Sequence, residues 1–579
     1  MLRMRQLLLI LLVCICSTPV YAEITVAVVI EGLERKLEDN VRLFLSIEQQ
    51  KDHALLSEGR LQRLHKKATQ EIENALQPFG YYRPLIVAEL SHPEQDFWQA
   101  KYVVDPGPAL KIAAINFTIS LQMQEDGAFS RLLREIPLRV GEVFNHLEYE
   151  SFKSSLAKLA SERGYFDARF SEHRVDIDLQ SYSASIHLNF EGGPRYSFGE
   201  VELQQDVLNE NFLRRFIPFE KGTPYTVNQL IELQHALNDS DYFRNAEVAL
   251  GEITPGSLEV PVKVTLTPRR RNHNSFGLGY GTDTGARTKI GWEIPRVNPK
   301  GHRFDSEAKL SEIGHSLGLR YRVPVLNPRT DQLIYSAGLV NEETDTSEST
   351  IRTIGVSLKR SRGEWRESVS INYQEEDFIV GADRGNSVLL MPGINWTRTW
   401  GSDFIYAVDG LRFDIGFRGA TTDLVSDTNF FQADGGIKAI TSLGSRDRVI
   451  ARGSLGAIET EQFENLPTSI RFFAGGAQSV RGYAYNSLGQ LDSSGEVVGG
   501  RYLMVGSLEY EHSLDDTWGL ALFYDAGNAI DDLADKLKVG AGFGLRWKSP
   551  IGPVRIDLAS ALSNRGQPWR LHINIGPDL

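Results

Sequence analysis

The sequence predicts two architectures in one exported chain: α+β repeats that read strand, helices, strand, strand, and then an antiparallel β-barrel that crosses a membrane. Three observations predict this. Two Gly-Pro openings, at Gly107 and Gly193, lie 86 positions apart in the first half. After residue 271 the hydrophobic period falls to two, and the first 22 residues read as an export signal. A chain of 579 residues is also too long for one core.

The N-terminus predicts a signal peptide over residues 1–22. Two arginines precede an apolar run at residues 7–16, and residues 20–22 offer the small side chains that a signal peptidase reads. The run is too short to span a bilayer by itself. Both cysteines, Cys14 and Cys16, lie inside this segment, so the mature chain contains no thiol and no disulfide scaffold.

Composition excludes several classes of function. The formal charge is −13, which argues against a nucleic-acid partner and leaves no polybasic anchor for acidic lipid. The twelve histidines lack metal-ligand spacing, and no Gly-rich phosphate loop precedes a helix, so we expect no cofactor, no metal and no enzyme. No later apolar run approaches the roughly 20 residues of a transmembrane helix, so a membrane protein of this kind must be a barrel.

The first half contains internal repeats with matching helix starts. Residues 105–112 are echoed by residues 191–198, and each run opens an alternating strand. Downstream, Asn145 and Thr226 each follow an aromatic residue and precede Glu or Gln by three positions, which is the pattern of a helix N-cap. The two segments therefore have the same internal order.

Each repeat is expected to contain a helix that buries one apolar face. The expected buried residues are Leu64, Ala68 and Ile72 in the first copy, Phe152, Leu156 and Leu159 in the second, and Leu230, Leu233 and Leu237 in the third. The copies occupy residues 23–104, 105–190 and 191–267. One irregular α+β domain is the alternative, but it leaves the doubled openings and helix starts unexplained.

The region 268–579 predicts the barrel. Residues 539–547, 553–559 and 570–576 each alternate between an apolar face and a face of Gly, Arg, Asp, His or Asn. Apolar residues outside and polar residues inside are typical of a transmembrane barrel. A soluble β-sandwich alternates too, but not normally over a single domain of this length.

A loop and a strand near the C-terminus form the candidate site. Residues 471–483 are rich in Gly and predict a loop. In the strand that follows, Leu520, Leu522 and Tyr524 share one face, so Asp525 points to the other. If the apolar face meets lipid, a loop that carries Arg481 into the lumen can pair with Asp525. The alternative is a surface loop and a solvated Asp525.

These residues carry a family resemblance. The loop motif of Val480, Arg481, Gly482 and Tyr483, followed by the strand motif of Phe523, Asp525 and Gly527, closely resembles the signature of the outer membrane protein assembly superfamily, whose barrels carry POTRA (polypeptide-transport-associated) domains. The resemblance implies sixteen barrel strands, an outer-membrane location, and three POTRA domains in the periplasm.

Within that superfamily, three POTRA copies and the terminal residues 576–579 are most similar to the outer-membrane subunit of the translocation and assembly module. This implies a protein that helps unfolded outer-membrane proteins, such as autotransporters, to insert, in contact with outer-membrane lipid and with a large partner anchored in the inner membrane. The alternatives are a polypeptide secretion pore of the two-partner type, a passive diffusion porin, and lipid transport with the partner.

The resemblance also implies that the barrel opens between its first and last strands. The residues expected at this lateral seam are Phe276, Gly277, Leu278, Gly279, Leu571, Ile573 and Gly576. Glycine weakens a strand interior, and Pro577 cannot donate a ladder hydrogen bond. The glycines have a second interpretation, in which they relieve crowding inside a curved wall.

Residues 314–318 match the Gly-x-Ser-x-Gly pattern of a hydrolase nucleophile elbow. That elbow requires a strand, a tight turn and then a helix. Here alternating residues follow the serine, so a strand is expected in place of the helix, and the match is expected to be fortuitous.

Overall fold

The computed structural model describes residues 25–53, 56–94, 97–401, 406–550 and 552–575. The predicted signal peptide, Gly576 and Pro577 lie outside these residues. The described residues divide into two compact units, one formed by those up to residue 200 together with 219–230 and 250–262, and the other by the remaining ones. Within the described residues, no helix is both long and apolar enough to cross a membrane.

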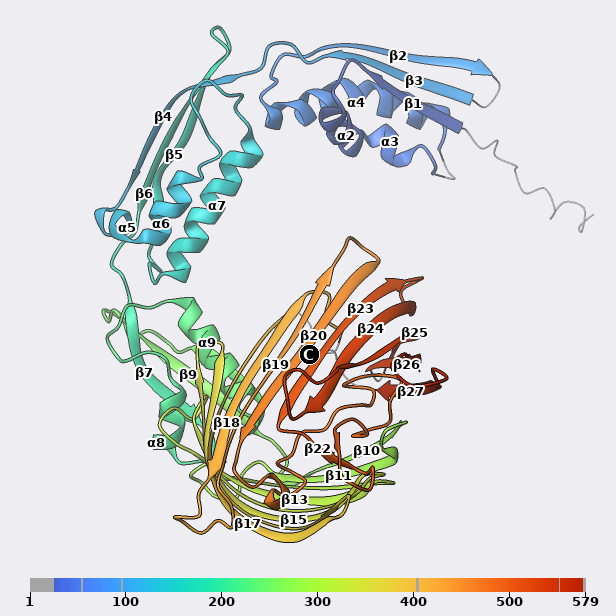
Figure 1. The fold of residues 1–579 in the computed structure, drawn as a ribbon. Helices are drawn as coiled ribbons and strands as arrows, with labels where there is room; N and C mark the ends of the chain where they lie inside the picture. Colours follow the sequence, from blue (N-terminus) through green and yellow to red (C-terminus); the bar gives the residue numbers. More distant parts are fainter. Residues whose placement is uncertain (1–24, 54–55, 95–96, 402–405, 551, 576–579) are drawn as a thin grey trace, which may run out of the picture. The chain divides into compact units, whose positions relative to one another are not determined.

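The first repeat is a three-stranded sheet covered by helices. Its elements are β1 (Thr25–Glu31), α2 (Arg35–Phe44), α3 (Ser46–Gln50), α4 (Glu58–Leu76), η1 (Gln77–Phe79), β2 (Leu85–Glu94) and β3 (Phe97–Asp105). The strand order is β1-β3-β2, with β3 parallel to β1 and antiparallel to β2 (Figure 1). Leu64, Ala68 and Ile72 of α4 are buried, as predicted.

The second repeat has the same order. Its elements are β4 (Lys111–Ile119), α5 (Leu121–Glu125), α6 (Gly127–Arg134), α7 (His146–Glu162), β5 (Arg169–Asp178) and β6 (Ser183–Glu191), in a sheet ordered β4-β6-β5. The Asn145 side chain accepts a hydrogen bond from the Leu147 N–H at 2.9 Å, which confirms the predicted N-cap. Phe152 and Leu156 are buried and Leu159 is partly buried.

The third repeat consists of β7 (Ser197–Gln204), α8 (Glu210–Leu213), η2 (Arg214–Phe216), α9 (Val227–Asn238), β8 (Phe243–Leu250) and β9 (Glu259–Pro268), with strand order β7-β9-β8. The Thr226 hydroxyl donates to the Gln229 side chain at 2.9 Å, across the expected helix start. Leu230, Leu233 and Leu237 are buried. Three mixed sheets thus confirm the predicted repeat architecture, while the boundaries at 104, 190 and 267 stay predictions.

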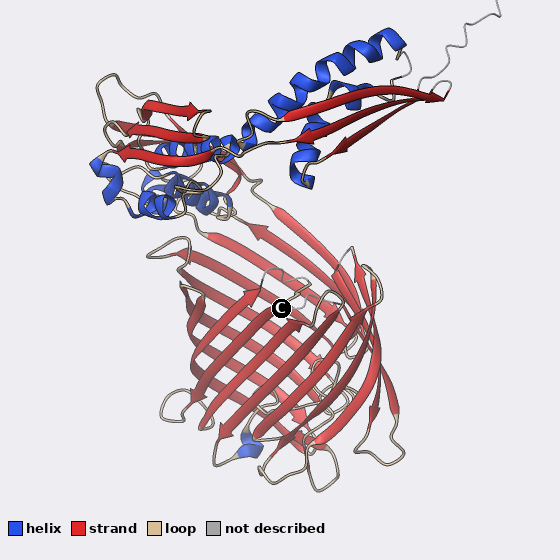
Figure 2. Cartoon of the chain, turned by 90° about the horizontal axis from the view of Figure 1, so that it is seen from above, coloured by secondary structure: helices blue, strands red, loops and turns tan. Residues whose placement is uncertain are grey.

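After β9, the described residues form an antiparallel sheet of sixteen strands. They are β10 (His273–Gly281), β11 (Gly285–Ile294), β12 (Arg303–Ser311), β13 (Gly314–Pro324), β14 (Gln332–Glu343), β15 (Ser347–Arg362), β16 (Trp365–Val380), β17 (Asp383–Gly401), β18 (Gly410–Ala420), β19 (Phe430–Ser442), β20 (Asp447–Glu459), β23 (Tyr502–Ser513), β24 (Trp518–Ile530), β25 (Lys538–Ser549), β26 (Gly552–Ala561) and β27 (Trp569–Ile575). Figure 2 shows these strands curving round into the barrel wall. The implied count of sixteen is confirmed.

The predicted alternation decides which side chains face the lumen. On β24, Leu520, Leu522 and Tyr524 are 49%, 62% and 53% exposed on the outer face. Their neighbours on the inner face, Phe523 and Asp525, are 5% and 0% exposed. Because successive strand residues point to opposite faces, an apolar outer band and a polar interior follow directly from the sequence.

The sheet order is linear, with β10 at one end and β27 at the other. Every consecutive pair of barrel strands is joined by a backbone ladder, from sixteen residue pairs between β16 and β17 to seven between β26 and β27. Over the described residues, which end at Ile575, no ladder joins β27 to β10. The contact between these two strands is called the seam below.

The Gly-x-Ser-x-Gly match lies at the start of β13, and the strand continues through Pro324. Ser316 is paired with Lys309 on one side and Val340 on the other. The tight turn and helix that a nucleophile elbow needs do not follow this serine.

A lumen loop and the barrel seam

The segment 460–501, called the lumen loop, connects β20 to β23 and is folded against the inner wall. It contains η3 (Phe463–Asn465), β21 (Gln490–Leu491) and β22 (Val497–Gly499). Val480, Arg481 and Tyr483 of its motif are 0%, 1% and 5% exposed. A polar loop with these side chains buried needs partners in the wall.

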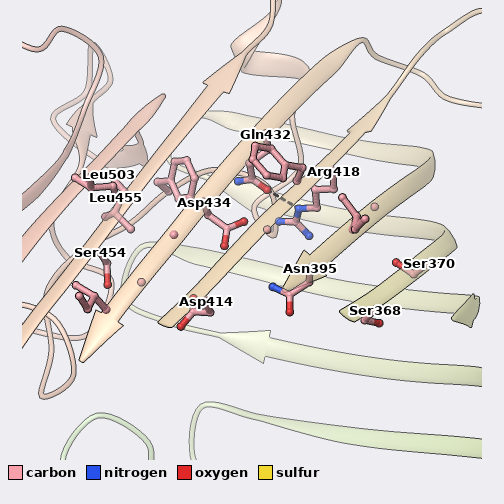
Figure 3. Close-up of a pocket in the computed structure, with 18 of the residues that line it drawn as sticks. Ser368, Ser370, Asn395, Asp414, Arg418, Gln432, Asp434, Ser454, Leu455 and Leu503 are labelled. Carbon is pink, nitrogen blue, oxygen red and sulfur yellow. Dashed lines mark hydrogen bonds between the residues drawn. The ribbon is translucent and has the colours of Figure 1, made fainter. Parts of the chain in front are cut away.

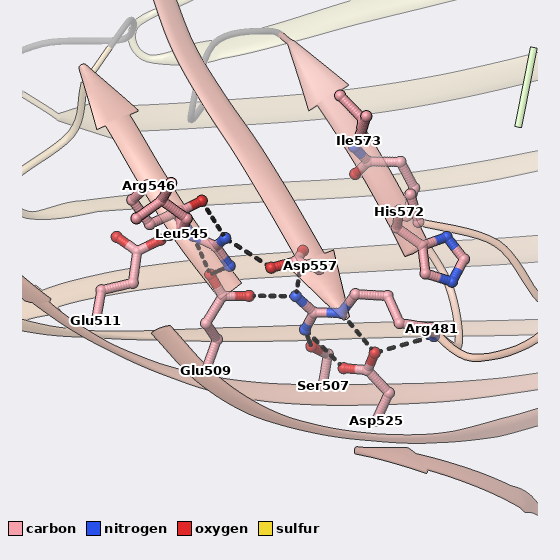
Figure 4. Close-up of polar contacts among 12 residues, drawn as sticks. Arg481, Ser507, Glu509, Glu511, Asp525, Leu545, Arg546, Asp557, His572 and Ile573 are labelled. Carbon is pink, nitrogen blue, oxygen red and sulfur yellow. Dashed lines mark hydrogen bonds and ion pairs between the residues drawn. The ribbon is translucent and has the colours of Figure 1, made fainter. Parts of the chain in front are cut away.

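The structure brings the two predicted site residues together. Arg481 Nε lies 2.7 Å from Asp525 Oδ2, and Arg481 Nη2 lies 2.9 Å from Asp525 Oδ1, which makes the pair bidentate (Figure 4). The backbone N–H of Arg481 also donates to Asp525 Oδ2 at 3.0 Å. The guanidinium carbon stands 3.4 Å from the centre of the Phe523 ring, so the predicted Phe523 supplies a cation–π contact.

A larger charge network, which sequence reasoning missed, surrounds this pair. Arg481 Nη1 is also 2.7 Å from Glu509 and 3.1 Å from Asp557. Arg546 bridges Glu509 and Asp557 at 2.6 Å each. All of these side chains are buried, so each charge depends on its partners. The sequence feature that could have indicated this network is the placement of acidic residues at inward positions of alternating strands.

Close backbone approach seats the motif against the wall. A Cβ on Gly540 of β25 would lie 1.9 Å from the Arg481 carbonyl oxygen. Gly482 has φ +96°, and a Cβ there would lie 2.9 Å from the Ala561 nitrogen. The Tyr483 hydroxyl donates to the Val539 carbonyl at 3.3 Å. Gly527 of β24 also lies close to a neighbouring backbone, since a Cβ added to it would lie 2.7 Å from the Met504 carbonyl oxygen of β23.

The lumen loop is also attached to the β16–β17 hairpin. Arg471, 4% exposed, lies 2.9 Å from Asp383. Asp492 accepts a hydrogen bond from the Ala382 N–H at 3.0 Å. Hydrogen bonds from the Ser494 hydroxyl and then from backbone N–H groups lower the pKa of Asp492 to about 2, so it is ionised at neutral pH.

At the seam, side chains join the two sides over the part of the chain that the structure describes. The Ile573 N–H donates to the Thr282 hydroxyl at 3.1 Å, and Arg287 Nη2 donates to the Ile575 carbonyl at 3.3 Å. Ile573 is therefore bonded to Thr282, in the turn that follows β10. Leu278 is 87% exposed.

The other residues expected at the seam fit the alternation of outward and inward side chains along β10 and β27. Phe276 and Leu571 are 79% and 48% exposed, and Gly277 and Gly279 lie between the outward residues of β10. A Cβ on Gly279 would lie 2.8 Å from Arg287 Nε, so this glycine leaves room for the arginine that reaches β27. Gly576 lies outside the described residues.

A cavity of about 1010 Å³ occupies the lumen beside β16–β20. Figure 3 shows Asp414, Asp434 and Arg418 among its lining side chains, with Arg418 hydrogen-bonded to Gln432. The polar lining of both charge signs suits water. Within the described ranges, no cluster of three or more His, Cys, Asp or Glu side chains is arranged to hold a metal ion.

Comparison with known families agrees with this geometry. Residues 297–578 match the Omp85 superfamily domain, residues 27–106 match "POTRA domain TamA domain 1", and residues 124–193 match the POTRA family described as "Surface antigen variable number repeat". The chain belongs to the Omp85 superfamily. It is an outer-membrane protein, and its POTRA domains lie in the periplasm.

Two individual proteins illustrate the similarity. This Omp85 protein is 22% identical over 504 residues to the outer membrane protein assembly factor BamA of Nitratidesulfovibrio vulgaris, covering 82% of this chain and 62% of that relative's length. In fold it is similar to BamA from Haemophilus ducreyi lacking POTRA domains 1–3, with a TM-score of 0.68, 16% identity, and coverage of 81% of this chain and 99% of that one.

Proposed function

We propose that this Omp85 protein is TamA-like: the outer-membrane subunit of a translocation and assembly module that helps outer-membrane proteins, such as autotransporters, to insert. The match of residues 27–106 to a TamA-type first POTRA domain supports this subfamily. Three α+β repeats, in place of the five usual for the main assembly factor, point the same way.

The proposed partner is a TamB-like protein anchored in the inner membrane that docks on the POTRA domains. Strands β2, β5 and β8 each lie at the edge of a three-stranded sheet. An edge strand presents unpaired backbone groups that an extended segment of a partner or client can join. On β2, Leu85 and Val87 are 70% and 68% exposed, which adds apolar surface beside that edge.

The proposed mechanism is lateral opening between β10 and β27, and the seam is the observation that carries it. Within the described residues, two side-chain hydrogen bonds join the two sides of the seam directly, whereas a ladder of sixteen residue pairs joins β16 to β17. With a net contribution of about 0.5–1.5 kcal/mol per hydrogen bond, the seam is by far the weaker joint. An opened seam exposes a free strand edge toward lipid, where a client strand can pair.

A disulfide across the seam tests this mechanism. The Thr282 hydroxyl lies 3.1 Å from the Ile573 nitrogen, which brings the two Cα atoms within the limit of about 7 Å for a disulfide. The pair Thr282→Cys and Ile573→Cys, in a mature chain without other cysteines, should abolish client assembly when oxidised and restore it on reduction. Ala439→Cys and Ala451→Cys, directly opposed on β19 and β20, are the matched control.

The expected result is loss of autotransporter insertion with the seam disulfide alone. Equal insertion by the oxidised and reduced seam variants contradicts lateral opening, and loss with the control pair assigns the effect to general rigidity. Loss of insertion with the seam pair but not with the control pair supports lateral opening over general rigidity.

A polypeptide secretion pore is the second candidate, and the polar lumen cavity favours it. A pore of that type should conduct ions in a planar bilayer once the lumen loop is removed, and the seam disulfide should not affect transport. A passive porin needs no POTRA domains. Comparison of outer-membrane proteins and lipids in cells with and without the gene separates protein insertion from lipid transport.

A further inference from the structure

The segment 476–482 of the lumen loop touches both sides of the seam. Asp283, in the turn that follows β10, accepts a hydrogen bond from the Ala477 N–H at 2.7 Å. His572, on β27, accepts a hydrogen bond through Nε2 from the Gly482 N–H at 2.9 Å. One short segment is therefore bonded at each end to a different side of the seam.

The two wall residues also face each other. His572 Nδ1 lies 3.7 Å from Asp283 Oδ1, although the residues are almost 300 positions apart in the chain. His572 is 1% exposed, and within the described residues its Nδ1 has no hydrogen-bond partner. Because Nε2 accepts a hydrogen bond, the proton of a neutral ring is on Nδ1, the nitrogen that lies 3.7 Å from Asp283.

The segment fits this position closely. Gly476 has φ +100°, a conformation that favours glycine, and a Cβ there would lie 2.8 Å from Asp283 Oδ2. Between the two attachment points, Arg481 is fixed to Asp525 of β24 by two side-chain hydrogen bonds and one from its backbone N–H. The wall therefore holds the middle of the segment, and residues on the two sides of the seam hold its ends.

We propose that residues 476–482 form a clasp that keeps the seam closed, with Asp283 and His572 as its positioning residues. The seam parts when the clasp releases one of them. This inference deepens the proposed function by naming what controls the opening, and it rests on that function only for its biological meaning, because the clasp itself is a property of the isolated barrel. Release of the clasp couples movement of the lumen loop to the free edge of β10.

Spin labels across the seam measure the clasp directly. Leu278→Cys and Leu571→Cys place labels on exposed residues of β10 and β27 in the full chain, which has no other cysteine after residue 16. Asp283→Ala or His572→Ala removes one acceptor and should increase the population with a longer label distance by about 2- to 10-fold, the effect of one lost hydrogen bond. Gly476→Ala should act in the same way from the loop side.

Conservative variants separate the clasp from general destabilisation. Asp283→Asn and His572→Gln each retain an oxygen that can accept the same N–H, so their label distances should stay close to those of the parent. Asp492→Ala is the matched control, because it frees the other end of the lumen loop from Ala382 without touching the seam. Its label distances should not change.

Unchanged distances in both Asp283→Ala and His572→Ala overturn the clasp, as does equal widening in Asp492→Ala. These outcomes are distinct from failure of the proposed function. If the oxidised seam disulfide leaves client insertion intact while the alanine variants widen the seam, lateral opening is wrong and the clasp stands. If the disulfide blocks insertion while the alanine variants change nothing, the clasp is wrong and lateral opening stands.

Discussion

Two regions of the barrel wall are closed by different interactions. Between β16 and β17, sixteen residue pairs are joined through the backbone, and the lumen beside these strands holds a polar cavity. At the seam, two side-chain hydrogen bonds join β27 to the β10–β11 hairpin within the described residues, and the lumen beside it is filled by the loop and its buried charges. The strands in both regions alternate in the same way.

Alternation of residues along the strands therefore determines which side chains face lipid and which face the lumen, but it does not determine how strongly two neighbouring strands are joined. A backbone ladder is broken only at the cost of many buried polar groups, which favours a permanent wall. Two strands that are joined only by side-chain hydrogen bonds can separate when the bonded side chains move. The buried charge network lies beside the seam. Substitutions near the seam and substitutions near β16 and β17 should therefore differ in their cost in stability.

The largest effect is expected when a charge of the seam-side network is removed. Asp525→Ala leaves Arg481 buried without its bidentate partner, and breaking a buried ion pair typically costs about 3–5 kcal/mol. We expect the denaturation midpoint of the purified barrel to fall and the lumen loop to become sensitive to protease. Arg481→Ala combined with Asp525→Ala should cost much less than the sum of the single changes, and additive costs contradict the pairing.

The second-largest effect is expected where the lumen loop packs against β25. Gly540→Ala directs a methyl group at the Arg481 carbonyl, only 1.9 Å from an ideal Cβ, and overpacking typically costs about 1–3 kcal/mol. Gly506→Ala on β23 is the matched control, because nothing lies within 4 Å of its Cβ. Chemical denaturation measures both. Equal costs at the two glycines disagree with a loop seated against β25.

The third effect is smaller and local. Thr282→Ala removes the acceptor of the Ile573 N–H, and one such hydrogen bond contributes about 0.5–1.5 kcal/mol. Amide hydrogen exchange should become faster in β27 and stay unchanged in β16. Faster exchange throughout the barrel indicates a global loss of stability and speaks against a separate, weaker joint at the seam.

The smallest effect is expected from an ion pair in the other region. Arg398 on β17 pairs with Glu364 in the turn between β15 and β16, and both side chains are largely exposed. Arg398→Ala should cost no more than about 1 kcal/mol, because water screens exposed pairs. A cost as large as that of Asp525→Ala removes the distinction between the two regions.

Local structure and the direction of several site residues could be predicted from neighbouring residues alone. The helix starts at Asn145 and Thr226, the outward face of β24 and the inward direction of Asp525 follow from neighbouring residues and strand periodicity. The pairing of Arg481 with Asp525 was predicted from the inward direction of Asp525 and from the glycines that mark a loop around Arg481.

Only the tertiary structure decided how the ends of the sheet meet. Glu509, Asp557 and Arg546 belong to the site because three strands present the same face to one arginine, and periodicity cannot say which inward residues lie at the same height. Closure of a sixteen-stranded sheet brings Asp283 beside His572. Strand register and barrel closure set these contacts between distant residues, whereas the sequence pattern records only which side of a strand each residue faces.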